Sequence, residues 1–267
     1  MSSITTIILS AIILSAMMFA AWAVQKRTSQ SGWADVFWSY AIGIGGVIVA
    51  LVPPGMAPIE RRWLVTAMVA FWSIRLGWHI MTRTFAATYE DPRYADLRRE
   101  WGDNFQFRIF AFLQIQALCG LGLVVTVFVA AHRPGTALSA ADYAGLAVLI
   151  ASVIGEAVSD AQLRAFTADK SSHGKVCDKG LWSWSRHPNY FFEWLGWIAY
   201  PIIAIDLSGG YGLGWLSLIG PAMMYWLLVY ASGIPPLEQH MLRSRGDAFK
   251  RYQARTSAFF PLPPRKI

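Results

Sequence analysis

Polar chemistry is concentrated in residues 180–200, which read Gly-Leu-Trp-Ser-Trp-Ser-Arg-His-Pro-Asn-Tyr-Phe-Phe-Glu-Trp-Leu-Gly-Trp-Ile-Ala-Tyr. Arg186, His187 and Asn189 stand directly before a hydrophobic run that still contains Glu193. An ionisable group inside such a run must find a partner or a water-filled cavity. The stretch therefore predicts a functional site at the mouth of a membrane-embedded helix.

A simpler interpretation of the same stretch is a juxtamembrane anchor. Trp182 and Trp184 would then lie at the level of the lipid headgroups, and Arg186 would contact lipid phosphate. An anchor accounts for these three residues, but it gives no purpose to Asn189 or Glu193. We therefore favour a site over an anchor.

The whole chain has the composition of a membrane protein. Its 267 residues are 55% hydrophobic and only 15% charged, with a mean hydropathy of +0.39, which is too apolar for a soluble domain of this length. We predict an all-α, polytopic integral membrane protein with seven transmembrane helices, in which cytoplasmic loops and the tail cap a cofactor site. The predicted helices cover residues 4–24, 33–52, 63–81, 110–131, 143–158, 191–205 and 215–231.

Two of these segments need comment. The sixth is short for a full crossing and contains Pro201, so we expect it to begin inside the protein or to be broken. The first has no basic residue before it and is followed by Lys26 and Arg27, which disfavours a cleavable signal peptide. Because the chain has no tandem repeat and no low-complexity linker, we expect a single domain over residues 1–267.

The distribution of basic residues predicts the orientation. With seven crossings, 19 of the 23 lysines and arginines fall on one side of the membrane, Lys266 among them. Arg61, Arg62 and Arg133 fall on the other side, and Arg75 lies inside the third helix. The positive-inside rule then places the N-terminus outside and the C-terminus in the cytoplasm.

The net charge of +7 therefore belongs to one face. That face attracts either anionic lipid or an anionic ligand. Nucleic acid is not an expected partner, since the basic residues are spread through membrane-facing loops. Cys119 and Cys177 cannot form a disulfide framework or a zinc cage, so we expect no metal. No obligate protein partner is indicated.

The third predicted helix carries Arg75, His79 and Arg83 four residues apart, hence on one face. A guanidinium inside the membrane needs an acid, carbonyl groups or water, and Glu156 and Glu193 are the available acids. Arg75 is then either half of a structural ion pair or part of the site. His79 is either a proton donor to a substrate or a partner in an interhelical hydrogen bond.

Polar residues also mark the ends of other segments. Asp35, at the start of the second helix, either complements the helix dipole or belongs to the site. Residues 89–102 have the pattern of a short helix, which either lies on the lipid surface or binds a ligand. Asp160 and Arg164 share a face with Glu156, where the three either pair with one another or meet a polar ligand. Residues 237–256 alternate charged and aromatic residues. This segment either forms a cap over the helix ends or is a plain surface tail.

No dinucleotide-binding glycine motif, nucleophile elbow, zincin motif or phosphate-cradling loop is found, so any cofactor must bind among helix ends and loops. The run from Gly180 to Phe191, followed by Glu193, resembles the signature of the steroid 5-alpha-reductases and their bacterial relatives of the DUF1295 group. The sequence Glu-Asp-Pro-Arg-Tyr at 90–94 and the tail from Leu237 to Pro261 also resemble that bacterial branch. Isoprenylcysteine methyltransferases, phospholipid methyltransferases and sterol reductases carry similar versions of the 186–193 motif.

This resemblance implies a seven-helix membrane enzyme that uses NADPH from the cytoplasmic side to reduce the C4–C5 double bond of a 3-oxo-steroid. Because the resemblance is to the bacterial branch, we expect the protein to lie in the bacterial inner membrane. Asn189 and Glu193 match the family's residues at the sixth helix, and Asp160 and Arg164 match those after the fifth. His79 and Arg83 match its third-helix motif. Ile80 stands where the family has the tyrosine that polarises the ketone, and Asp35 is the acid nearest to the family's second-helix glutamate.

Forked guanidinium groups suit a dinucleotide with a 2′-phosphate, and an enone needs a group that stabilises the developing enolate oxygen. The resemblance and this chemistry together give two sets of candidates. The candidates for the enolate-stabilising, catalytic group are Asp35, Tyr40 and His79. The candidates for binding NADPH are Arg83, Arg93, Tyr94, Arg98, Asp160, Arg164, Trp184, Arg186, His187, Asn189, Tyr190, Glu193, Glu238, Tyr252 and Arg255.

We therefore expect an NADPH-dependent oxidoreductase that acts on the C=C bond of a steroid-like, lipophilic enone in the bilayer. Two other classes compete with it. An S-adenosylmethionine-dependent membrane methyltransferase would use the same Arg-His-Pro-Asn-Tyr entrance together with Glu238. A non-enzymatic sterol-binding protein would keep the fold without cofactor contacts, but the retained polar residues argue against it.

Overall fold

The computed structural model describes residues 1–52, 55–87 and 90–265, so the predicted contributions of Tyr89 and Lys266 lie outside the described residues. Within these ranges the chain is helical and forms no β-strand, apart from an isolated bridge between Ser185 and Ser257. Six helical stretches are long and apolar enough to cross a membrane. They are Ser3–Thr28, Trp33–Leu51, Ile59–Ala86, Arg93–Ala131, Ala140–Ala168 and Gly212–Arg245.

Six of the seven predicted crossings fall in these stretches, which supports a multi-pass membrane protein. The predicted segment 191–205 forms α7 (Pro188–Ala204), a helix of 17 residues with Pro201 inside it. At 1.5 Å per residue this helix is at the lower limit for a crossing. A seventh crossing and the orientation of the termini stay predictions.

The helices group into two compact units, each described here by itself. The first consists of Met1–Tyr143 with Tyr200–Met223, and the second of Ala144–Ala199 with Met224–Ile267. The expected single domain over residues 1–267 stays a prediction.

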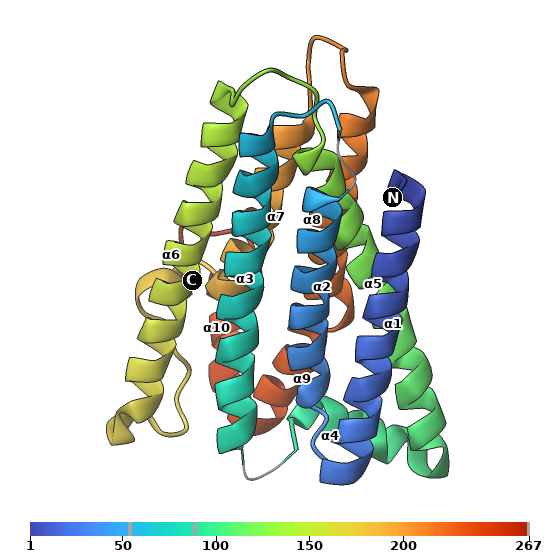
Figure 1. Ribbon diagram of the computed structural model, residues 1–267. Helices are drawn as coiled ribbons and strands as arrows, with labels where there is room; N and C mark the ends of the chain where they lie inside the picture. Colours follow the sequence, from blue (N-terminus) through green and yellow to red (C-terminus); the bar gives the residue numbers. More distant parts are fainter. Residues whose placement is uncertain (53–54, 88–89, 266–267) are drawn as a thin grey trace. The chain divides into compact units, whose positions relative to one another are not determined.

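The first unit is a bundle of α1 (Ser3–Thr28), α2 (Trp33–Leu51), α3 (Ile59–Ala86) and α5 (Phe105–Ala131), which run side by side in Figure 1. Helix α2 contacts the other three. Glycines allow a close approach between α2 and α3: a Cβ on Gly43 would lie 2.1 Å from the Ser73 hydroxyl, and one on Gly46 would lie 2.8 Å from Val69. Small residues at membrane helix interfaces serve this purpose.

A short helix and a buried ion pair complete the first unit. Helix α4 (Pro92–Trp101), capped by the Asp91 side chain, confirms the short helix predicted within residues 89–102. At the start of α3, Arg61 Nε lies 2.6 Å from Asp142 Oδ1 at the start of α6 (Ala140–Ala168), and both side chains are fully buried. Arg61 therefore lies in the first turn of α3 and not in a loop, and its charge is neutralised by this carboxylate.

The second unit contains most of α6 and α7, the C-terminal end of α8 (Ile219–Trp226), a π-helical turn η5 (Leu227–Ala231), α9 (Ile234–Arg245) and α10 (Asp247–Arg255). Beyond α10 the chain returns to α7. The buried Phe259 ring lies edge-on to Phe191, Trp194 and Tyr225, with ring centroids 5.3–5.9 Å apart. Buried aromatic pairs of this geometry hold the tail against the helix.

Candidate functional site

Arg186, in the loop before α7, connects three parts of the second unit. Its Nε and Nη2 lie 2.7 and 3.1 Å from the two carboxylate oxygens of Glu238 on α9. Its Nη1 donates to the carbonyl oxygens of Gln253 and Thr256, at 3.2 and 2.5 Å. Gln253 in turn donates to Glu238 at 2.6 Å. We call Arg186, His187, Glu238, Gln253 and Thr256 the tail latch.

His187 is the buried member of the tail latch. Its Nε2 lies 3.0 Å from Glu238 Oε1, and its ring stacks on Tyr190 with centroids 5.6 Å apart. Burial lowers the pKa of His187 below its ordinary value of 6.5; the Glu238 carboxylate opposes this shift and the Arg186 charge adds to it. The imidazole is therefore neutral at pH 7, and its Nε2–H donates to Glu238.

The loop that delivers Arg186 is held in place by α6 and α10. Gly180 has a φ of +58°, and a Cβ there would lie 2.5 Å from the Gln162 side chain, whose oxygen accepts from Leu181 N at 2.9 Å. Trp182 Nε1 donates to the Ser159 carbonyl at 2.9 Å. The Tyr252 hydroxyl donates to the Trp182 carbonyl, and burial raises the pKa of Tyr252.

Helix α7 carries the predicted amide and carboxylate. Asn189 Nδ2 lies 3.4 Å from Asp160 Oδ1 on α6, while its Oδ1 accepts from the Tyr190 backbone at 3.0 Å. Glu193, one turn further on, is 7% exposed and accepts from Trp197 Nε1 at 3.3 Å. The structure therefore brings Asn189 and Asp160 together, and it buries Glu193 in the same unit. Arg164 and Trp184 are exposed.

A pocket of about 280 Å³ borders the tail latch. Three arginines line it: Arg186, Arg255 and Arg265. Arg255 also forms an ion pair with Asp178. Thr256 lines the same pocket, and its buried hydroxyl has no hydrogen-bond partner among the residues that the structure describes. Arg265 was missed from the sequence, because the chain beyond Pro261 has no pattern that relates it to Arg186.

The first unit holds its predicted residues in a charge network around α4. Arg93 Nη2 lies 2.7 Å from Asp35 Oδ2, and the Tyr94 hydroxyl donates to Asp35 Oδ1 at 3.1 Å. Arg93 also donates to Asp91 at 3.0 Å from Nε and Nη2, and Arg83 lies 3.8 Å from Asp91. Asp35 is therefore engaged as an acceptor. Its role as a catalytic group stays a prediction.

Burial raises the pKa of Asp91, but the hydrogen bonds and charge of Arg93, together with the charge of Arg83, lower it by more, so the pKa of Asp91 is below its ordinary value.

A second ion pair in the same unit joins Arg98 to Glu90. Arg98 donates to Glu90 at 2.9 Å and 3.1 Å, and Ser31 donates to Glu90 at 2.6 Å. Asp91 and Glu90 belong to the Glu-Asp-Pro-Arg-Tyr motif, but the sequence did not identify them as the acceptors.

The two other catalytic candidates lie on neighbouring helices of the first unit. The Tyr40 ring of α2 lies against α3 at Gly77, where a Cβ would be 2.6 Å from its Cζ. The His79 carbonyl accepts from the Thr82 hydroxyl at 2.9 Å. Arg75 and His79 both have partners in the protein. As catalytic groups Tyr40 and His79 stay predictions, as do the NADPH ligands of both units.

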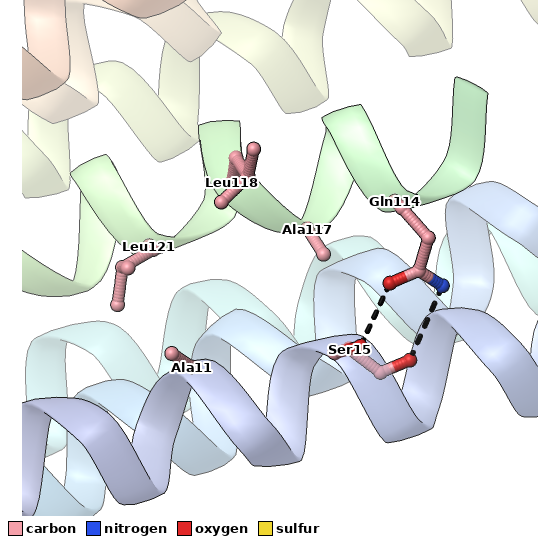
Figure 2. A pocket seen from close by; sticks show the side chains of 6 residues that line it. All are labelled: Ala11, Ser15, Gln114, Ala117, Leu118 and Leu121. Carbon is pink, nitrogen blue, oxygen red and sulfur yellow. Dashed lines mark hydrogen bonds between the residues drawn. The ribbon is translucent and has the colours of Figure 1, made fainter. Parts of the chain in front are cut away.

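A cavity of about 200 Å³ lies between α1 and α5 (Figure 2). Its wall is apolar except for Ser15 and Gln114, whose side chains hydrogen-bond to each other at 2.7 Å. Leu118 on its rim is 68% exposed. None of the predicted site residues lines this cavity, which has the character of a lipid-facing groove.

Comparison with known proteins identifies the family. No curated protein and no solved structure matches the chain. A family model described as a protein of unknown function, DUF1295, matches residues 21–256. Because this match covers most of the chain, the protein belongs to the DUF1295 family of steroid 5-alpha-reductase-like membrane proteins.

Proposed function

We propose that this protein is an NADPH-dependent membrane reductase that transfers a hydride to the C=C bond of a lipophilic enone, such as a 3-oxo-4-ene steroid. The family match supports a reductase-like membrane protein. The observation that carries the cofactor assignment is the pocket of the second unit, which is lined by three arginines.

The pocket fits one part of a phosphorylated dinucleotide. At about 280 Å³ it is just below the roughly 300–1,000 Å³ of pockets that hold a drug-sized ligand, so it suits a phosphate-bearing end and not the whole molecule. Guanidinium groups bind phosphate through paired N–H donors. The Thr256 hydroxyl, which has no partner within the described part of the chain, is a further polar group beside the pocket.

The arginines of the pocket have different tasks. Arg186 is 10% exposed, and its donors already meet Glu238 and two carbonyl groups, so it holds the tail in place and adds positive charge to the wall. Arg255 and Arg265 are the groups that would contact phosphate. Asn189 and Glu193 on α7 offer an amide and a carboxylate for the nicotinamide carboxamide.

Equilibrium binding to the detergent-solubilised protein tests the proposal. NADPH is expected to bind saturably and S-adenosylmethionine is not, and Asn189→Ala and Arg255→Ala are expected to weaken NADPH binding about tenfold or more. Arg251→Ala, on the exposed side of the same helix α10, is the matched control and should leave the affinity unchanged. Saturable binding of S-adenosylmethionine without NADPH binding would favour a methyltransferase and overturn the proposal.

A further inference from the structure

The groove between α1 and α5 lies wholly within the first unit (Figure 2). Its volume of about 200 Å³ is smaller than the roughly 300–1,000 Å³ of pockets that hold a drug-sized ligand. It is larger than a cavity of roughly 150 Å³, which holds a benzene ring. The groove therefore suits one large apolar side chain and not a steroid-sized molecule.

The polar pair in this groove has hydrogen-bonding capacity left over. The Ser15 hydroxyl donates to Gln114 Oε1 at 2.7 Å, and Gln114 Nε2 donates to the Ser15 carbonyl at 3.5 Å. A primary amide has two N–H groups, and its oxygen has two lone pairs. Within the described part of the chain, the second N–H and the second lone pair of Gln114 have no partner.

The depth of the pair makes a free N–H unfavourable. Ser15 lies near the middle of α1, about 18 Å from either end at 1.5 Å per residue. Because the hydrocarbon core of a bilayer is about 30 Å thick, the pair lies inside it, away from headgroups and water. An acyl chain offers no acceptor there, and an unpaired N–H in hydrocarbon costs free energy. A helix with a polar side chain at the same depth supplies the missing acceptor.

A second copy of this chain offers both the acceptor and an apolar side chain for the groove. A two-fold axis along the membrane normal keeps every residue at its own depth, so Gln114 meets Gln114 of the partner subunit. Leu118, one turn further along α5, is 68% exposed and stands on the rim of the groove. It is therefore at the depth of the partner's groove, where Ala11 and Ala117 leave room for it.

We propose that two copies of this protein form a symmetric dimer through α1 and α5. Leu118 of each copy fills the groove of the other. The free N–H of each Gln114 donates to the free lone pair of the other, so the two amides satisfy each other. This surface is separate from the tail latch and its pocket, and the dimer does not depend on the proposed reductase function.

Energy transfer between full-length proteins in liposomes tests the dimer. Wild-type protein labelled at the N-terminus with a donor or an acceptor dye is mixed, reconstituted and diluted with lipid. Energy transfer should follow a monomer–dimer curve. Leu118→Ala removes the inserted side chain, Ala11→Leu fills the groove from its own chain, and Gln114→Leu removes the amide. Each should weaken association about tenfold. Ile154→Ala, at a 58% exposed position of α6, is the matched control and should leave it unchanged.

The folded state of each variant is checked by its thermal unfolding midpoint in detergent. Leu118→Ala should leave the midpoint near that of the wild type, because the side chain is mostly exposed in a single copy. Wild-type energy transfer no greater than that of randomly mixed monomers would overturn the proposal, and acyl chains would then fill the groove. Association that Leu118→Ala, Ala11→Leu and Gln114→Leu all leave intact would also overturn it, since the dimer would form through another face. Neither result bears on NADPH binding.

Discussion

Each unit holds an arginine between carboxylate oxygens, but the two arginines are enclosed to different degrees. Arg186 in the tail latch is 10% exposed and bonds to Glu238 and to two backbone carbonyls. Arg93 in the α4 network is 26% exposed and shares two carboxylates, Asp35 and Asp91. In the tail latch a single acid, Glu238, neutralises a nearly buried arginine. In the α4 network two acids, Asp35 and Asp91, neutralise a more exposed one.

This difference indicates that the tail latch depends on a single ion pair and the α4 network does not. Removing one partner of a buried pair leaves an uncompensated charge, which costs more than the pair contributes to stability. A partly exposed arginine with two acids loses less, because water and the second acid remain. The tail latch is therefore expected to be the more sensitive of the two.

The largest effect is expected for Glu238→Ala. This change leaves the Arg186 guanidinium buried without its carboxylate and removes the acceptor of His187 and Gln253. The free energy of unfolding should fall by about 3–5 kcal/mol. Thermal unfolding in detergent measures it, with the exposed neighbour change Gln239→Ala as the control. A fall no larger than that of the control would contradict the tail latch.

Asp35→Ala should have a smaller effect. Arg93 keeps Asp91, while Tyr94 loses the acceptor of its hydroxyl. We expect the free energy of unfolding to fall by about 1–2 kcal/mol. If the free energy of unfolding fell as much as in Glu238→Ala, the α4 network would also depend on a single ion pair, which would contradict the comparison.

The next effect concerns pH. His187 is buried among Arg186, Glu238 and Tyr190, and its pKa in the folded protein lies below 6.5. Below pH 6.5 the unfolded chain binds a proton that the folded protein does not. The contribution of His187 to stability is thus complete above pH 6.5 and is lost as the pH falls through the folded pKa, by at most about 1.4 kcal/mol per pH unit.

Unfolding midpoints at pH 7.5 and pH 5.5 check this prediction. The wild type should lose more stability between the two values than His187→Gln, which cannot titrate. Equal losses in the two proteins would show that His187 is not the group responsible.

The smallest effect is expected at the surface of α10. Lys250 and Asp247 form an ion pair at 3.0 Å, but both side chains are mostly exposed. Exposed pairs of this kind contribute little, because water and salt screen them. Lys250→Ala should not change the unfolding midpoint measurably, and a clear fall would mean that α10 has a partner through this residue.

The helices were predictable because each rests on a local signal. Apolar runs gave the six stretches, and apolar residues spaced three and four apart gave the short helix within residues 89–102. Helix α7 begins at Pro188, three residues before the predicted apolar run, because proline suits the first turn and the polar Asn189 and Tyr190 are helical too. Periodicity alone does not reveal such a polar first turn.

The site was predictable only in part. Arg186 stood out as a charge at the start of a helix, but Glu238, its partner, lies 52 residues away, and no local pattern joins the two. The same holds for Arg61 and Asp142, which are 81 residues apart. Pairings of this kind depend on the tertiary packing of distant helices, which local patterns in a single sequence do not reveal.

The most direct test of the central claim is a comparison of NADPH and NADH affinities for the solubilised wild type at one salt concentration. The two cofactors differ only in the 2′-phosphate, which Arg255 and Arg265 are proposed to bind. The account predicts that NADPH binds at least about tenfold more tightly, and that Arg265→Ala removes most of this preference. Equal affinities, or a preference that Arg265→Ala and Arg255→Ala both leave intact, would contradict it.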